Sequence, residues 1–131
     1  MFGALKLFNE CKKNDIKPIV GCEFYVAANR FSKHTRKNGY NHITLLARTQ
    51  QGYKNLLKLT SMSYIEGLSW KPRVDMELLK RYSEGVTCLS GCLSGRINEL
   101  ILAGDQRSAE DMTSTLRDIY GKEHFWLELQ R

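Results

Sequence analysis

The sequence contains no long hydrophobic run, and this absence argues against a membrane protein. No uncharged apolar stretch in its 131 residues approaches the roughly 20 residues that a helix needs to cross a bilayer. The first residues, MFGALK, also lack the basic start and the long apolar core of a secretory signal. We therefore expect a cytoplasmic chain without a membrane partner.

Cysteine is too sparse to indicate a disulfide framework. The four cysteines are Cys11, Cys22, Cys88 and Cys92. In a chain without an export signal, free thiols or metal ligands are more common than disulfides. Three residues separate Cys88 from Cys92, and no second pair follows them, so the two do not form a zinc finger.

Positive charges outnumber negative ones, but not to the extent that is typical of a disordered chain. Lys and Arg total 20 against 14 Asp and Glu, which gives a formal net charge of +6. Such an excess favours acidic partners such as nucleic acid, although many proteins carry it without binding any. Hydrophobic residues at 42% and charged residues at 26% are ordinary for a globular chain, and the length predicts at most one domain.

One segment, residues 28–40, is polar, basic and aperiodic, which predicts a loop. Its cations Arg30, Lys33, Arg36 and Lys37 are candidates for contact with a phosphate backbone. A solvated surface loop explains them at least as well.

The hydrophobic periodicity predicts strands that alternate mostly with helices. The predicted helices cover residues 2–14, 50–66, 75–81, 96–103 and 109–120, and the predicted strands cover 19–27, 42–47, 85–89 and 125–129, with a turn at 67–73. Strands separated by helices are typical of the α/β class, because parallel neighbours need a crossover connection. We therefore expect a largely parallel sheet.

Glu23 is the most unusual residue of the first predicted strand. It interrupts an apolar run that otherwise looks buried on both faces. A buried carboxylate is costly unless a cation or a hydrogen-bond donor faces it. Strand alternation puts Glu23 and Tyr25 on one face and Phe24 on the other. Glu23 therefore either faces such a partner or reaches water at the strand end, and the sequence weighs the two equally.

His42 and Cys92 are weaker candidates when taken singly. A lone histidine is more often a hydrogen-bonded structural residue than a ligand. Cys92 lies between Gly91 and Gly95 just after a predicted strand, which is where ligands gather in parallel α/β folds. Glu, His and Cys together make a mixed oxygen, nitrogen and sulfur set suited to zinc or to a harder divalent cation. Three residues so far apart in the chain do not establish such a site.

Several long segments together resemble one known family. In order along the chain they are MFGALKLFNECKKNDIKPIVGCEFYVA, NHITLLARTQQGYKNLLKLTSMSYIEG, KPRVDMELL, YSEGVTCLSGCLSGRI and FWLELQR. They are similar to the PHP (polymerase and histidinol phosphatase) domain at the N-terminus of bacterial DNA polymerase III alpha subunits. The resemblance runs through residues 1–131, with only the loop around 28–40 looking variable.

The resemblance implies that residues 1–131 are part of a distorted parallel (β/α)7 PHP barrel. About four strands with intervening helices are expected, without the first two strands and the last strand. No polymerase palm, fingers or thumb is expected in this chain.

The same resemblance implies a divalent metal cluster (Zn, Mn or Mg) in the intact PHP domain. Glu23, His42 and Cys92 match three of the family's ligand positions. The family's H-x-H pair, Asp-His pair and D-x-H pair have no counterpart in this sequence. The cluster is therefore expected to be incomplete in this chain.

The function implied is that of a piece of the replicative alpha subunit, a DNA-directed DNA polymerase that works with DNA and other replisome subunits. The PHP segment would contribute to a metal-dependent phosphoesterase, or 3′–5′ exonuclease, site in the intact protein. The alternatives are a structural or partner-binding PHP module without hydrolytic activity, the error-prone alpha paralogue, or a stand-alone PHP phosphoesterase. Whether this chain alone is an enzyme stays open.

Overall fold

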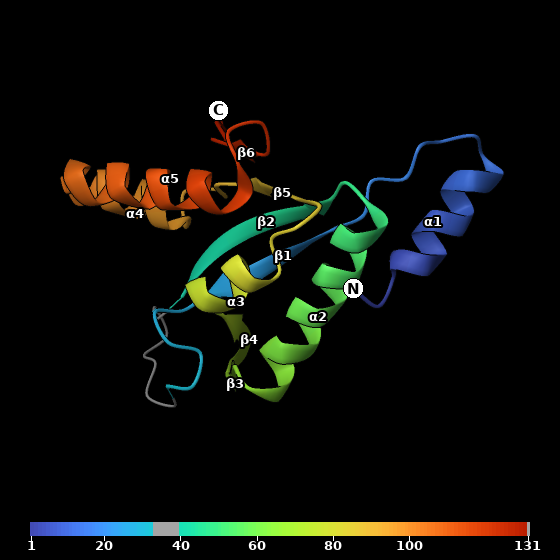
Figure 1. Ribbon diagram of the computed structural model, residues 1–131, viewed down its shortest axis with the longest axis horizontal. Coiled ribbons are helices and arrows are strands. Elements are labelled where there is room, and N and C mark those ends of the chain that lie inside the picture. Colours follow the sequence, from blue (N-terminus) through green and yellow to red (C-terminus); the bar gives the residue numbers. More distant parts are fainter. Residues whose placement is uncertain (33–39, 131) are drawn as a thin grey trace.

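The computed structural model describes residues 1–32 and 40–130, and these form one mixed sheet with helices (Figure 1). Lys33, Arg36 and Lys37 of the predicted basic loop lie outside the described residues. The helices are α1 (Ala4–Lys13), α2 (Gln50–Ile65), α3 (Met76–Arg81), α4 (Arg96–Leu102) and α5 (Gln106–Tyr120), and the strands are β1 (Gly21–Val26), β2 (Asn41–Ala47), β3 (Leu68–Ser69), β4 (Lys71–Val74), β5 (Val86–Leu89) and β6 (Phe125–Trp126). The expected α/β class is confirmed.

The six described strands are ordered β3-β4-β1-β2-β5-β6. β1 is parallel to β4, and β5 is parallel to β6, whereas β2 is antiparallel to both β1 and β5. Four strands therefore run in one direction, and β2 and β3 run against them. Because β2 follows β1 in the chain and pairs with it directly, the two need no crossover helix.

The segment predicted to hold a turn, residues 67–73, does turn at Trp70, but it also contains β3 and most of β4, which were not predicted. A tight hairpin joins them at Trp70, whose φ of 61° is rare for a bulky residue. Pro72 pairs with Leu68 near the edge of the sheet, where proline is tolerated. Strands as short as β3 and β4, with Gly and Pro in the same segment, show too little hydrophobic periodicity to be detected in the sequence.

One face of the sheet holds the hydrophobic core. Phe24 of β1, Leu45 of β2 and Cys88 of β5 are buried on it. α2, α3 and α5 cover this face, and α2 and α3 cross in front of the strands in Figure 1. Their buried core residues include Leu56, Leu59, Leu78, Leu79, Leu116 and Tyr120.

The opposite face of the sheet is open over β1 and β2 in the described part of the chain, whereas at β4 Arg73 is 1% exposed and donates to the Arg30 and Ser32 carbonyl oxygens. Tyr25, His42 and Thr44 on this face are partly buried, and Glu23 is exposed. The expectation that β1 is buried on both faces was therefore wrong: its side chains alternate between a covered and an open face, as strand geometry requires. We refer below to this side of the sheet as the open face.

Side-chain caps stabilise the first turns of α2 and α3, the helices that cover the core. The Thr49 hydroxyl accepts a hydrogen bond from the Gly52 amide at the start of α2 (3.1 Å), and the Asp75 carboxylate accepts one from the Leu78 amide at the start of α3 (3.2 Å). Both are side-chain caps of otherwise unpaired helix amides. The helix predicted over residues 75–81 is therefore present and begins with its cap at Asp75.

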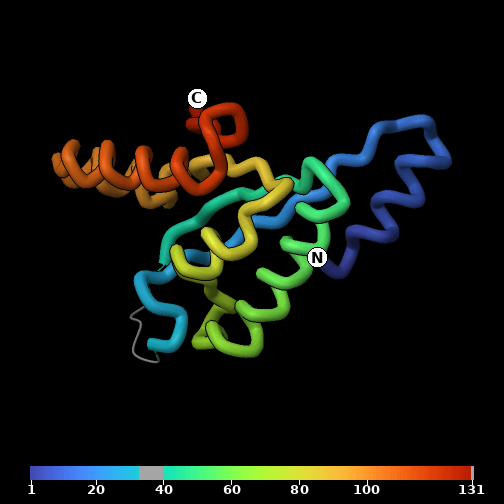
Figure 2. The backbone as a smooth tube through the Cα atoms, viewed as in Figure 1, coloured from blue at the N-terminus to red at the C-terminus, as the bar shows by residue number. Residues whose placement is uncertain are grey.

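Helix α1 stands apart from this body, at the end of the molecule opposite α4 and α5 (Figure 2). The predicted helix is present, but in the described structure none of its residues is buried. Phe2, just before it, is 94% exposed, and Leu5 within it is 69% exposed. Its apolar stripe is therefore uncovered. Among the described residues, no helix is long and apolar enough to cross a membrane.

Candidate functional site on the open face

Glu23 and His42 meet on the open face. Glu23 lies opposite Thr44 and Tyr25 lies opposite His42 in the antiparallel β1–β2 pair, so Glu23 and His42 are diagonal neighbours. Glu23 Oε1 contacts His42 Nδ1, and the two side chains are 57% and 27% exposed. The partner of the unusual carboxylate is thus a histidine at a water-accessible surface, and not a buried cation.

The Glu23–His42 contact gives the imidazole a defined role. A carboxylate that engages Nδ1 fixes the ring orientation and leaves Nε2 as the nitrogen available to a ligand. This carboxylate–imidazole arrangement is common around metal sites.

Cys92 lies on the turn that packs against the start of β2. Gly91 has a φ of +86°, and a Cβ placed there would come within 2.7 Å of the His42 carbonyl oxygen. The Asn41 side-chain amide donates to the Ser94 carbonyl at 3.2 Å, which ties the same turn to β2. The thiol itself accepts a weak hydrogen bond from the Ser94 amide at 3.5 Å.

The structure brings two of the three candidate ligands together and places the third on an adjoining turn. Within residues 1–32 and 40–130, no group of three or more His, Cys, Asp or Glu side chains is arranged to hold a metal ion. The donor chemistry of Glu23, His42 and Cys92 suits zinc or a harder cation, but Glu23 and His42 alone do not complete a coordination sphere. These residues fit part of a metal site.

Two of the remaining cysteines are poor ligands because burial keeps them protonated. Cys88 is fully buried on the core face, and this burial raises its pKa far above the ordinary value for a thiol. Burial is also the main cause of the raised pKa of Cys22. Neither belongs to the open face: Cys88 is part of the hydrophobic core, and Cys22 packs against it.

Two aromatic side chains lie beside the candidate site, and the sequence predicted neither as part of it. The Tyr25 ring lies edge-on to His42, with centroids 4.8 Å apart, and edge-on to Tyr40 at 4.9 Å. Lys71 Nζ lies 5.4 Å from the centroid of Tyr25. Alternation along β1 placed Tyr25 on the Glu23 face, but nothing local to Tyr40 or Lys71 indicated that they would join it.

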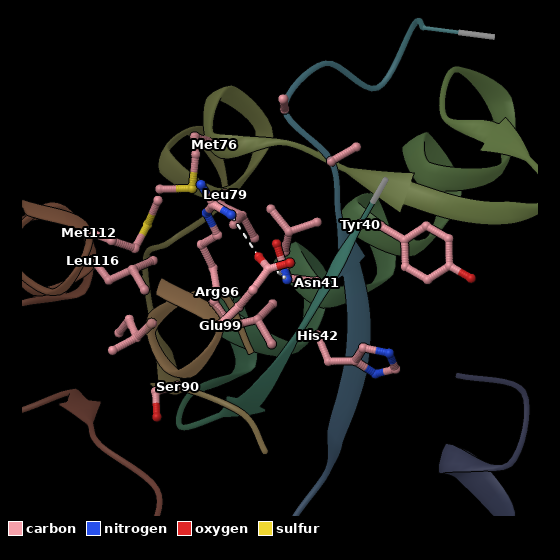
Figure 3. A pocket seen from close by; sticks show the side chains of 15 residues that line it. Tyr40, Asn41, His42, Met76, Leu79, Ser90, Arg96, Glu99, Met112 and Leu116 are labelled. Carbon is pink, nitrogen blue, oxygen red and sulfur yellow. Dashed lines mark hydrogen bonds and ion pairs between the residues drawn. The ribbon is translucent and has the colours of Figure 1, made fainter. Parts of the chain in front are cut away.

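A cavity of about 430 Å³ lies on the core side of the sheet, beside the start of β2 (Figure 3). Tyr40 and His42 are among the residues that line this cavity, but their side chains point away from those of Arg96 and Glu99. Arg96 donates to Glu99 at 2.6 Å and Asn41 donates to Glu99 at 3.1 Å. The hydrogen bond from Arg96 is the main cause of the lowered pKa of Glu99. Asn41, Arg96 and Glu99 are thus hydrogen-bonded to one another, and these bonds hold the start of β2, which carries His42, in place.

Arg30 has a role that neither view of the basic loop anticipated. It is 5% exposed, and its guanidinium donates to Asp75 at 2.8 Å and to Glu66 at 2.6 Å. A further hydrogen bond of 2.8 Å reaches Glu77. Arg30 is thus an internal ion-pair residue and faces neither a phosphate backbone nor solvent. The loop after β1 is fastened by it to the end of α2 and the start of α3.

Comparison with known proteins gives the family. The sequence matches the PHP domain over residues 1–131. Proteins named DNA polymerase III subunit alpha are 45% identical in Treponema pallidum (strain Nichols), 46% identical in Borreliella burgdorferi and 40% identical in Thermus aquaticus, each over at least 99% of this chain. The chain spans about 11 to 12% of the length of these relatives. The expected resemblance is confirmed, and the chain belongs to the PHP domain family.

Proposed function

We propose that this chain contributes Glu23, His42 and Cys92 to a metal-dependent phosphoesterase site in a DNA polymerase III alpha subunit. The observation that carries the proposal is the Glu23–His42 contact on the open face of the sheet. The names of the relatives supply the context, because the three proteins named above are DNA polymerase III alpha subunits.

The reaction that suits this site is hydrolysis of a phosphodiester, as in removal of a 3′ nucleotide. Glu23 orients the imidazole of His42 through Nδ1, which leaves Nε2 for a cation. Cys92 offers a sulfur ligand from the turn beside His42. A bound divalent cation (Zn, Mn or Mg) would lower the pKa of bound water and polarise a phosphoryl oxygen.

The rest of the metal site belongs to other segments of a longer protein. The described residues supply too few ligands for a complete cluster. We propose that residues 1–131 are a partial PHP barrel, that the strands absent from this chain carry the missing ligands, and that polymerase activity, DNA and replisome contacts and a cytoplasmic location belong to the whole protein.

A second candidate is a structural or partner-binding PHP module without hydrolytic activity. It is favoured by one observation: in the described residues, Cys92 is not grouped with Glu23 and His42 around a common centre. Neither the error-prone paralogue nor a stand-alone phosphoesterase has a comparable observation in its favour.

The test compares Glu23→Gln/His42→Asn with the wild type in the full-length polymerase that carries this segment. We expect bound metal to fall and 3′ nucleotide release to slow at least about 10-fold, because the variant removes a ligand and the group that orients it. Metal is measured by elemental analysis, and release is measured with an end-labelled DNA strand.

The matched control is Glu110→Gln/His124→Asn, which removes the same two groups from α5 and from the turn before β6. Unchanged polymerase activity in both variants shows that the protein has folded. Unchanged metal content and unchanged release in Glu23→Gln/His42→Asn would overturn the proposal and favour the structural module.

A further inference from the structure

The open face carries an aromatic cluster directly beside the Glu23–His42 pair. Tyr25 contacts the rings of His42 and Tyr40 edge-on, with interplanar angles of 77° and 70°. Tyr40 and His42 are themselves 6.4 Å apart. Edge-to-face contacts hold the rings at fixed angles, so the cluster is a rigid apolar surface.

Lys71 adds a cation to this cluster from the neighbouring strand. Tyr25 is opposite Arg73 in the parallel β1–β4 pair, and Lys71 precedes Arg73 by two residues, so Lys71 shares the face of Tyr25. Its ammonium lies 5.4 Å from the centre of the Tyr25 ring, and the residue is exposed. The open face thus presents carboxylate and imidazole, then two phenol rings, then an ammonium group.

The position of these rings distinguishes them from packing aromatics. Phe24 and Phe125 are on the core face and are at most 9% exposed. Tyr25 and Tyr40 are instead partly exposed, on the face that no described helix covers. Aromatic rings that remain accessible next to a cation are the features with which proteins hold single-stranded nucleic acid.

We propose that Tyr25, Tyr40 and Lys71 form a nucleotide subsite that positions the end of a single DNA strand beside Glu23 and His42. The terminal base stacks on the tyrosine rings, and a backbone phosphate pairs with Lys71. This inference rests on the proposed phosphoesterase function and assigns residues to its substrate. Stacking on an aromatic ring tolerates any base, so the subsite selects an unpaired end and not a sequence.

The first measurement uses the wild-type 131-residue chain and a 5′-fluorescent oligothymidylate, with EDTA present so that no metal contributes. Binding is followed by fluorescence anisotropy, and the same strand with an abasic 3′ nucleotide is compared. We expect the abasic end to weaken binding about 10-fold, within the range measured for loss of one stacked base. Equal binding of the two strands would overturn the proposal without reference to any variant.

The second measurement tests the residues. Tyr25→Leu should weaken binding of the intact strand about 10-fold and should abolish the difference between the intact and abasic strands, because ring and base act as a pair. Lys71→Gln should reduce the dependence of log Kd on log salt by about one ion, since it removes one phosphate contact. Tyr64→Leu and Lys58→Gln on α2 are the matched controls and should change neither quantity.

These binding results can be distinguished from the result of the test of the proposed phosphoesterase function. Loss of discrimination in Tyr25→Leu, with no nucleotide release by the full-length protein, would support the subsite and contradict the hydrolytic site. Nucleotide release that depends on Glu23 and His42, with equal binding of intact and abasic strands, would do the reverse. Weakening by the control variants equal to that by Tyr25→Leu and Lys71→Gln would also overturn the subsite.

Discussion

Among the individual residues of the core, Tyr120 at the end of α5 has an unusual environment. Its hydroxyl is buried and has no hydrogen-bond partner among the described residues. Burial also raises the pKa of this phenol well above its ordinary value. A buried polar group without a partner costs about 1 to 3 kcal/mol of desolvation, so this hydroxyl opposes folding.

We therefore expect Tyr120→Phe to raise the free energy of unfolding by about 1 kcal/mol. The change keeps the ring that packs in the core and removes the hydroxyl. Urea unfolding measures it, with Tyr64→Phe at a 47% exposed position of α2 as the control that should change stability little. A loss of stability in Tyr120→Phe would show instead that the hydroxyl is satisfied, for example by a bound water.

At the scale of elements, the Arg30 cluster joins three parts of the chain that are far apart in sequence. Arg30 follows β1, Glu66 ends α2, and Asp75 both caps α3 and accepts the guanidinium. Asp75 is largely buried, with its side chain 10% exposed. Removal of one partner of a buried ion pair leaves the other charge uncompensated.

Arg30→Met should lower the free energy of unfolding by about 3 kcal/mol, because the substitution keeps an apolar stem but leaves Asp75 unpaired. Arg107→Met, at an exposed position of α5, is the matched control and should cost less than about 0.5 kcal/mol. Both are measured by urea unfolding. A loss below about 1 kcal/mol in Arg30→Met would contradict the view that this cluster fastens the loop after β1.

The elements differ in how well the sequence predicts them. The helices and β1, β2 and β5 follow from periodicity, and the cap at Asp75 follows from its residue type. β3 and β4 do not, because they are short and because Pro72 within β4 is typical of a turn and not of a strand. β6 ends at Trp126, before the predicted 129, and α5 begins at Gln106, before the predicted 109, because helix and strand ends depend on contacts that periodicity does not register.

The candidate site is likewise only partly predictable from the sequence. Alternation along β1 correctly placed Glu23 and Tyr25 on one face. Their contact with His42 depends on the register of β1 against β2, and the approach of Lys71 depends on the pairing of β1 with β4. Pairings between strands are properties of the folded chain, so no local pattern reveals them. The grouping of all three ligands around a metal stays a prediction.

At the scale of the whole molecule, two buried ionisable groups, a thiol and a phenol, make the free energy of unfolding decrease at alkaline pH. Cys88 and Tyr120 both have raised pKa values in the folded chain, chiefly through burial. In the unfolded chain a thiol ionises near pH 8.5 and a phenol near pH 10. The folded state keeps these protons when the unfolded state has lost them, so stability is fully present below about pH 8.5 and falls as pH rises.

We expect the free energy of unfolding to fall by up to about 1.4 kcal/mol per pH unit for each such proton. Urea unfolding at about pH 7.5 and about pH 9.5 measures the slope. Cys88→Ala should be less stable at the lower pH because it leaves a cavity, but its stability should fall less steeply with pH. Parallel slopes for wild type and variant would contradict the assignment to Cys88.

The one-sided covering of the sheet has a consequence for how this sequence can change over evolutionary time. Along β1, Phe24 contributes to the core, while its neighbours Glu23 and Tyr25 project from the open face. Substitutions at alternate positions of a single strand are therefore subject to different selection, one set for folding and the other, if the proposed function holds, for chemistry. A descendant could then lose the candidate ligands one by one while its core stayed intact, and the same fold would persist as a scaffold.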